Sequence, residues 1–159
     1  MPSITALLHT ENDALRLGRC LETLHPCDQI VVVDHGSRDL TVRIARAYGA
    51  IVLPAEHESS ADFYLQHAGS GWIFCLDPRE SFTEGLSASL FEWKFLPVSP
   101  TPSAFSVRMR EETDLGWVGI PAAQTRLVPH GWKRWMGRFP RHEPTAASLE
   151  GELLRFTLP

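Results

Sequence analysis

Residues 28–41 read Asp-Gln-Ile-Val-Val-Val-Asp-His-Gly-Ser-Arg-Asp-Leu-Thr, and this stretch decides the fold class. Its β-branched run at residues 30–33 is typical of a strand buried on both faces of a parallel sheet. The run ends at Asp34, and either Ser37 or Asp39 can cap a helix that follows. Gly49 is well placed to end that helix. The stretch therefore predicts a strand that leads directly into an amphipathic helix.

The same alternation of strand and helix extends to both sides of this stretch. Further strands are expected at residues 4–8, 50–53 and 72–76. The other expected helices begin after Asn12 or Asp13, cover residues 62–68, and follow a capping box formed by Ser81 and Glu84. This order predicts an α/β fold with a mostly parallel central sheet flanked by helices.

The second half of the chain has a different pattern. Pro97, Pro100 and Pro102 mark a loop. After it, strands are expected at residues 104–109, 125–128 and 153–158, with a turn-rich segment between the first two. The length of 159 residues fits one domain, so we expect residues 1–159 to form a single domain with the halves 1–96 and 97–159.

Composition excludes several classes of protein. The net charge of −4 argues against a protein that coats nucleic acid. No stretch approaches the roughly 20 apolar residues of a membrane span, and no secretory signal is visible. The three cysteines show no C-x-x-C spacing, which favours buried structural thiols. We therefore expect a cytoplasmic protein.

Acidic residues follow three of the expected strands. Glu11 comes soon after the first strand, Asp34 ends the second, and Asp77 ends the strand at 72–76. In open α/β sheets ligands bind beyond the carboxyl ends of the strands. Carboxylates gathered there repel one another, which favours a cation, ribose hydroxyls or a base N–H as their partner. The alternative is that each one caps a helix.

The segment Asp77-Pro78-Arg79-Glu80 is more informative. Two carboxylates three residues apart at a strand end can hold Mg²⁺ or Mn²⁺ with a diphosphate completing the coordination. The alternative is a simple turn, because Asp-Pro is a common turn opener.

These motifs resemble the family 2 glycosyltransferases, which have the nucleotide-diphospho-sugar transferase (GT-A) fold, and the nearest branch resembles the enzymes that add sugars to lipopolysaccharide cores. The motifs that carry the resemblance are His9-Thr10-Glu11, residues 28–41, residues 45–50, residues 72–80, Arg126-Leu127, Trp135-x-Gly137, His142-Glu143 and Leu149-x-Gly151-x-Leu153.

The resemblance implies a function and a set of residue roles. It implies inverting transfer of a sugar from a nucleotide-diphospho-sugar to a cell-envelope glycan or a lipid-linked acceptor, with residues 1–96 as the nucleotide-binding half and 97–159 as a reduced acceptor half. The implied nucleotide contacts are Glu11, Asp34, Ser37 and Asp39, and the implied diphosphate and metal ligands are Asp77 and Glu80 with Mg²⁺ or Mn²⁺. Glu143 is the implied general base, with His142 beside it as a candidate acceptor or metal contact.

The sequence also departs from the family's pattern. Arg79 stands at the middle position of the Asp-x-Asp motif, where it removes a metal ligand and adds a cation. It either replaces the metal's charge against the diphosphate or marks a lost activity. Thr10, Ala61-Asp62 and Arg155 replace an Asn, an Arg-Asn pair and a His of the family, and the acceptor half is short. The alternative function is thus a non-catalytic module that binds a nucleotide, a glycan or a protein.

Residues 130–142 mix aromatic and basic side chains. Trp132, Trp135 and Phe139 alternate with Lys133, Arg134, Arg138 and Arg141. One interpretation is a peripheral contact with the anionic inner membrane surface. The others are core tryptophans with a solvated cationic rim, and stacking of an aromatic ring on a sugar.

Overall fold

The computed structural model describes residues 2–56, 61–66, 71–97 and 102–158. Its strands are β1 (Ile4–Thr10), β2 (Gln29–Asp34), β3 (Ile51–Pro54), β4 (Trp72–Leu76), β5 (Glu80–Phe82), β6 (Phe105–Thr113), β7 (Gly116–Gly119), β8 (Gln124–Pro129), β9 (Trp135–Met136), β10 (Phe139–Pro140) and β11 (Ala147–Arg155). Its helices are α1 (Ala14–Glu22), α2 (Thr41–Ala47), α3 (Ala61–Leu65) and α4 (Glu84–Trp93).

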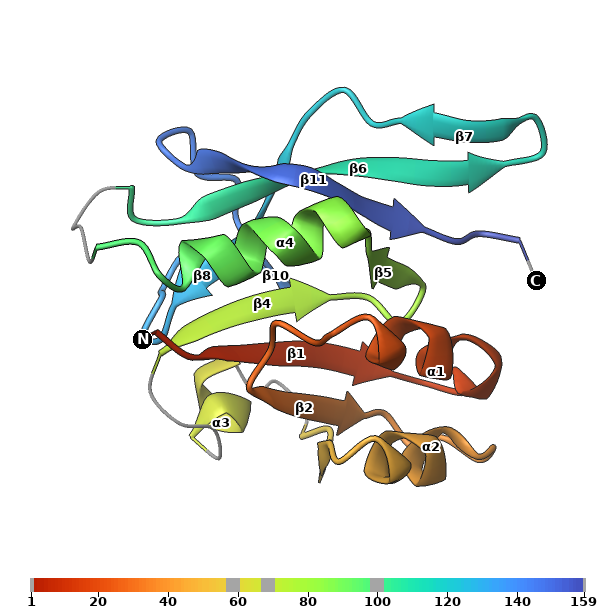
Figure 1. Ribbon diagram of the computed structural model, residues 1–159. Coiled ribbons are helices and arrows are strands. Elements are labelled where there is room, and N and C mark those ends of the chain that lie inside the picture. The colour runs from red at the N-terminus through yellow and green to blue at the C-terminus, as the bar shows by residue number, and fades with distance from the viewer. Residues whose placement is uncertain (1, 57–60, 67–70, 98–101, 159) are drawn as a thin grey trace.

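A single mixed sheet runs through both halves of the described chain (Figure 1). Its order is β3-β2-β1-β4-β8-β6-β11-β5, and β7 pairs with β6 outside this path. The strands β3, β2, β1 and β4 are parallel to one another. Beyond β4, the pairing alternates: β8 is antiparallel to both of its neighbours, and β6 and β11 are parallel. The expected α/β fold with a parallel central part is confirmed.

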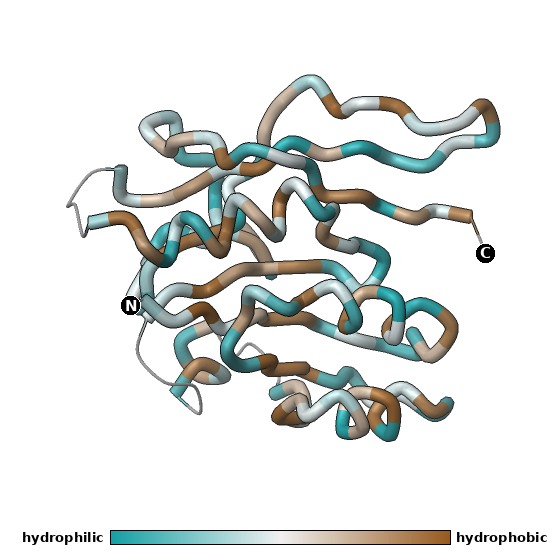
Figure 2. Tube along the Cα trace, viewed as in Figure 1, coloured by the Kyte–Doolittle hydropathy of each residue, from teal (hydrophilic) through white to brown (hydrophobic). Residues whose placement is uncertain are grey.

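Each face of the sheet carries its own hydrophobic core. On one face, Ala6 and Leu8 of β1 pack with residues of α1, α2 and α4. On the other face, Leu7 packs with α3 and with Trp132. Because side chains alternate along a strand, a strand covered on both faces must be apolar throughout. Figure 2 shows this for β4, whereas β6 becomes hydrophilic toward its C-terminal end.

The start of α4 corrects one expectation. The residue that caps this helix is Thr83, whose Oγ1 accepts a hydrogen bond from the Leu86 N–H at 3.2 Å. Ser81 lies in β5 opposite Leu154, so it does not form a capping box with Glu84. The side chain of Phe82 enters the core, and pairing with β11 keeps the chain extended to that point. The helix can begin only after this strand ends.

Other elements have different bounds from those expected from the sequence, because their strands pair with other segments of the chain. The last strand was expected at residues 153–158, but β11 begins at Ala147 and ends at Arg155. The turn-rich segment contains β7, which extends β6 as an antiparallel hairpin. The end of the helix expected at 62–68 and Pro100 of the expected loop lie outside the described residues.

Gly151 shows how closely β11 approaches α4. Its backbone φ is +90°, and an added Cβ would lie 2.6 Å from the Leu86 Cα and closer still to the Leu86 nitrogen. Only glycine fits this position, because a methyl group would overlap the backbone of the helix.

The three cysteines are present as thiols. Cys20 and Cys75 are buried, Cys27 is half-buried, and all three are free thiols. Burial raises the pKa of the Cys27 and Cys75 thiols to about 12, which makes them unreactive. None of the helices in the described part of the chain has the length and hydrophobicity that a membrane span requires.

Candidate functional site

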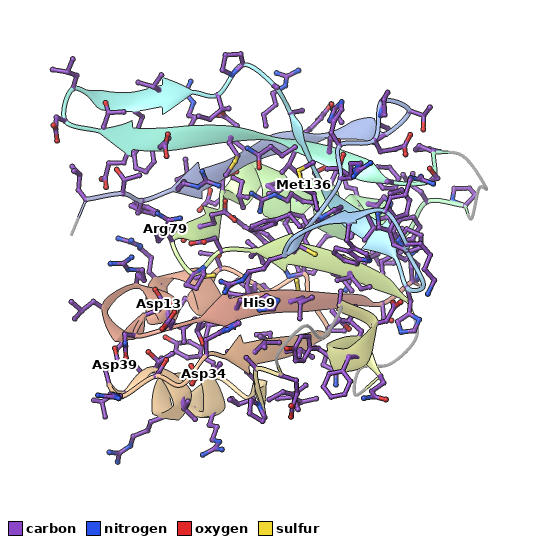
Figure 3. The ribbon with its side chains drawn as sticks, turned by 180° about the vertical axis from the view of Figure 1, so that it is seen from behind. His9, Asp13, Asp34, Asp39, Arg79 and Met136 are labelled. Carbon is purple, nitrogen blue, oxygen red and sulfur yellow. The ribbon has the colours of Figure 1, made fainter. Side chains whose placement is uncertain are left out.

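The carboxyl ends of β2, β1 and β4 lie side by side, since these strands are neighbours and parallel. Figure 3 shows Asp13, Asp34, Asp39 and Arg79 gathered at this edge of the sheet. The carboxylates interact there: besides burial, the charges of Asp77 and Asp39 raise the pKa of Asp13. The edge is therefore the place where the sequence-predicted groups come together.

Asp34 is held by hydrogen bonds within the protein. Its Oδ1 accepts from the Thr10 Oγ1 at 2.8 Å and from the Ser37 Oγ at 2.6 Å, and its Oδ2 accepts from the Ser37 N–H at 2.9 Å. Burial raises the pKa of this carboxyl, but these hydrogen bonds outweigh burial and leave the pKa below its usual value. Asp34 is thus an ionised, preorganised acceptor whose oxygens are already largely occupied.

Ser37 and Asp39 join the loop after β2 to the loop after β1. The Ser37 Oγ accepts a hydrogen bond from the Asn12 N–H at 2.8 Å, and the Asn12 side chain accepts from the Arg38 N–H at 2.8 Å. Asn12 has a φ of +53°, a left-handed conformation that asparagine tolerates. Asp39 accepts from the Ala14 N–H at 3.2 Å. These contacts hold the loops after β1 and β2 in one conformation at the carboxyl edge of the sheet.

Asp39, as an alternative to Ser37, and Asp13, as an alternative to Asn12, were candidate helix caps. The N-cap position of α2 is Leu40, yet the Asp39 Oδ1 just before it accepts from the Thr41 N–H at 3.0 Å. Asp13 occupies the N-cap position of α1, but its carboxylate accepts from the Glu11 N–H instead of from the helix. Asp39 therefore accepts from the first N–H of both α1 and α2, whereas Asp13 orders the loop that precedes its own helix.

Glu11 lies at the exposed end of β1. Its charge acts on His35, where it opposes the effect of burial on the pKa of that histidine. Among the three acids expected to converge on this edge, Glu11 faces solvent most openly, since Asp34 is buried and Asp77 is half-buried.

Asp77 is paired with Arg79, the residue that departs from the family motif. Its Oδ1 accepts from both the backbone N–H and the Nε of Arg79 at 2.9 Å, and its Oδ2 lies 3.4 Å from the Nη2. Burial favours protonation of Asp77, but the hydrogen bonds from Arg79 outweigh it and hold the pKa below its usual value. The Arg79 side chain is 41% exposed, so the pair sits at the surface of the edge.

Glu80 lies in a different environment from Asp77. Its side chain is fully buried and receives two hydrogen bonds from Arg126, at 2.7 and 3.0 Å, and one from Arg155 at 3.0 Å. It also accepts from the Asp77 N–H at 2.8 Å. Both of its oxygens are thus engaged below the surface. This geometry does not support the metal-ligand role that the resemblance implies for Glu80.

Metal ligands of the usual kinds are not gathered anywhere in the described part of the chain. Within those residues, no group of three or more His, Cys, Asp or Glu side chains is arranged to hold an ion. At the end of β4, the two expected carboxylates are engaged by three arginines instead. The residues present therefore do not fit the Mg²⁺ or Mn²⁺ site expected from the resemblance.

Glu143 is tied to the strand beside β4. Its backbone N–H donates to the Thr125 Oγ1 at 2.9 Å. Phe74 of β4 pairs with Leu127 of antiparallel β8, so the start of β8, where Thr125 lies, is directed toward the carboxyl end of β4. Glu143 thus approaches the same edge of the sheet, and His142 next to it is exposed.

The carboxylate of Glu143 is also hydrogen-bonded. Thr145 donates to its Oε1 at 2.8 Å, and the Arg134 Nη2 lies 2.6 Å from its Oε2. These contacts, that of Thr145 above all, lower the pKa of Glu143. A group that stays ionised in this way can accept a proton over a wide pH range, although with weak basicity.

A histidine pair at this edge was missed in the sequence analysis. The His9 Nδ1 and the His35 Nε2 are 2.9 Å apart, and the His9 ring packs edge-on against Tyr64. The pKa of His9 is lowered to about 4, mainly by burial and then by the charges of Arg138 and His35. A sequence signal existed, because His9 and His35 stand at the ends of adjacent parallel strands.

The aromatic residues of segment 130–142 pack inward. Trp132 is buried, and Trp135 and Phe139 pack against the same core. The guanidinium groups of Arg134 and Arg126 lie over the rings of Trp132 and Phe139. This agrees with the interpretation of core aromatics with a cationic rim, and it leaves the basic side chains and the exposed Met136 for an expected membrane contact.

Comparison with known proteins gives both sequence and structural similarities. No family model matches the chain. The chain is 28% identical over 97 residues to the lipopolysaccharide core biosynthesis glycosyltransferase LpsC of Rhizobium meliloti, a match that covers 56% of this chain and 36% of LpsC. The chain therefore spans little more than a third of the length of this curated relative.

Solved structures of other proteins have a fold similar to that of this chain. TarS of S. aureus in complex with UDP superposes with a TM-score of 0.52 at 16% identity, covering 76% of this chain and 38% of TarS. Mannosyl-3-phosphoglycerate synthase of Rubrobacter xylanophilus gives a TM-score of 0.51 at 21% identity, covering 70% of this chain and 40% of that enzyme. The chain thus has the GT-A glycosyltransferase fold and is similar in sequence to part of a lipopolysaccharide-core glycosyltransferase.

Proposed function

We propose that the chain binds a nucleotide-diphospho-sugar at the carboxyl edge of β2, β1 and β4 and transfers the sugar to a cell-envelope glycan or a lipid-linked acceptor, with inversion. The observation that carries this proposal is the meeting of Glu11, Asp34 and Asp77 at that edge in a chain with the GT-A fold. Ligands of open α/β sheets bind at such an edge.

The proposed roles follow from exposure and hydrogen bonding. Glu11 is the exposed acid that can accept hydrogen bonds from the nucleoside. Asp34, Ser37 and Asp39 hold together the loop after β1, which contains Glu11, and the loop after β2. Asp77 lies beside the diphosphate. In this proposal residues 1–96 supply the nucleotide site and residues 97–159 supply the acceptor side.

Glu143 is the proposed general base, because inverting transfer needs a carboxylate that removes the proton of the acceptor hydroxyl. Its contact with Thr125 brings it toward the edge where the diphosphate would lie. His142 is the proposed neighbouring contact for the acceptor. The similarity to LpsC favours an acceptor of the lipopolysaccharide-core type.

A binding and transfer assay tests this proposal. The chain is titrated with UDP and GDP by calorimetry and then incubated with labelled UDP- and GDP-sugars and core oligosaccharide. We expect micromolar to millimolar nucleotide binding and transfer that Glu143→Gln abolishes without weakening nucleotide binding. A chain that binds neither nucleotide would refute the proposal.

A second candidate is a non-catalytic module that binds a nucleotide or a glycan. The pairing of Asp77 with Arg79 favours it, because that carboxylate is already neutralised. The same assay separates the two functions: nucleotide binding without transfer, unchanged in Glu143→Gln, identifies the module.

A further inference from the structure

The charges at the end of β4 are arranged for an anion and not for a cation. In a nucleotide site, Mg²⁺ is usually held by one or two carboxylates together with the substrate phosphates. The Asp77 Oδ1 accepts from two N–H groups of Arg79, and Glu80 is buried between Arg126 and Arg155. Glu80 is therefore closed to a metal ion, and the Nη2 of Arg79 lies 3.4 Å from the remaining Asp77 oxygen, where a cation would have to bind.

The other nearby acid does not complete a metal site either. The Asp13 Oδ2 accepts from the Glu11 N–H at 2.8 Å, and its Oδ1 lies 3.8 Å from the Arg16 Nε. The charge of Asp77 contributes to the raised pKa of Asp13. Arg79 and Asp13 both lie at the carboxyl edge in Figure 3.

Arg79 is fixed in place and still has donors to offer. Its backbone N–H is bound to Asp77, and its carbonyl accepts from the Phe156 N–H at 2.9 Å. Of its five side-chain N–H bonds, only those on Nε and Nη2 contact Asp77. The side chain is 41% exposed, and Nη1 takes no part in the contact with Asp77, so we expect Nη1 to be available to a ligand. A planar guanidinium of this kind binds phosphate oxygens in a bidentate manner.

Resting on the proposed function, we propose that Arg79 takes the place of the divalent cation, so that the chain binds the diphosphate of its nucleotide through this guanidinium without a metal ion. Asp77, which stands where an Asp-x-Asp motif has a metal ligand, then positions Arg79. Arg79 in turn contacts the diphosphate. The positive group that meets the diphosphate then belongs to the chain itself, so its presence does not depend on the metal content of the solution.

The test is a calorimetric titration of the full chain with UDP and GDP, each in EDTA and in MnCl₂. For the nucleotide that binds, we expect dissociation constants that agree within about twofold in the two buffers. Binding in MnCl₂ that disappears in EDTA would overturn the inference and leave the proposed function intact. Absence of binding in both buffers would overturn the proposed function itself, and the inference with it.

Variants of Arg79 sharpen the test. Arg79→Gln should weaken nucleoside diphosphate binding at least about tenfold while leaving uridine or guanosine binding unchanged, since a lost bidentate contact affects only the phosphates. Arg79→Lys should keep part of the affinity. Equal affinity of Arg79→Gln and the unmodified chain would overturn the inference.

Arg79→Asp restores the acidic motif and gives the opposite dependence. This variant should lose nucleotide binding in EDTA and regain it in MnCl₂, because an aspartate at residue 79 no longer neutralises Asp77 and adds a ligand. Arg108→Asp, at an exposed position of β6, is the matched control and should bind as the unmodified chain does. An Arg79→Asp variant that binds equally well in EDTA would contradict the proposed role of the guanidinium.

Discussion

The buried ion-pair cluster beneath the candidate site gives the sharpest stability prediction. Arg126 and Glu80 are 1% and 0% exposed and form two hydrogen bonds of 2.7 and 3.0 Å. Arg126 also donates to the Cys75 carbonyl at 3.0 Å and to the Gln124 Oε1 at 2.8 Å. Arg126→Met keeps the apolar volume and removes every one of these contacts, which leaves Glu80 buried with fewer partners.

The cost can be estimated from what remains. Removal of one partner of a buried ion pair typically costs about 3–5 kcal/mol. Arg155 and the Asp77 N–H still bind Glu80 in the variant, so we expect the lower end, about 3 kcal/mol. For a chain of this length, that corresponds to a fall in Tm of about 6–12 °C. The surface pair Arg110–Glu152, 48% and 37% exposed with a 2.9 Å contact, is the matched control; Arg110→Met should cost at most about 1 kcal/mol.

Urea unfolding followed by tryptophan fluorescence measures both variants. A double-mutant cycle with Glu80→Leu should reveal a coupling of at least about 2 kcal/mol, because the double variant leaves no buried carboxylate without a partner. Equal stabilities for Arg126→Met and Arg110→Met would refute this reasoning. So would a Glu80→Gln variant of unchanged stability that lost metal-dependent nucleotide binding, since that result would make Glu80 a metal ligand.

Three further predictions follow from other positions. Gly151→Ala should be at least about 2 kcal/mol less stable than Gly131→Ala in urea unfolding, because both glycines have φ near +90° but only Gly151 faces helix backbone; equal losses would contradict this packing. Burial and then Arg138 lower the His9 pKa from 6.5 to about 4, so the unfolded chain binds more protons in this window and stability should rise with pH from 4 to 6.5 by about 3 kcal/mol. His9→Gln should flatten that rise, and an unchanged slope of stability against pH would contradict this role of His9. If Glu143 is the general base, its lowered pKa places the acid limb of the pH–rate profile below pH 4.5, and a limb above pH 6 would point to another base.

Much of the parallel half was predictable from local pattern. The run at residues 30–33 and the run at 72–76 became β2 and β4 almost residue for residue. Central strands covered on both faces must be apolar throughout, so their sequences carry a strong signal. β5, β7, β9 and β10 were not predicted, because strands of two to four residues are too short to show a periodic pattern, and β5 also depends on pairing with the distant β11.

The candidate site was predictable in its location and not in its contacts. Placing Glu11, Asp34 and Asp77 after parallel strands was enough to expect them at one edge. The separation of Asp77 from Glu80 was not visible, since three residues of sequence do not reveal that one side chain faces solvent and the other meets Arg126. A signal for Arg126 did exist: a charged residue inside the apolar strand run at 125–128 needs a buried partner.

By itself the sequence determined the α/β class, the order of the first strands and the edge where a ligand would bind, because periodicity, capping residues and strand-end polar residues are local properties. Only the tertiary structure decided what the charged groups at that edge do. Charges interact through space and their effect depends on burial, so the pairing of Arg79 with Asp77 and the burial of Glu80 between two arginines appear only when β4, β8 and β11 are brought together.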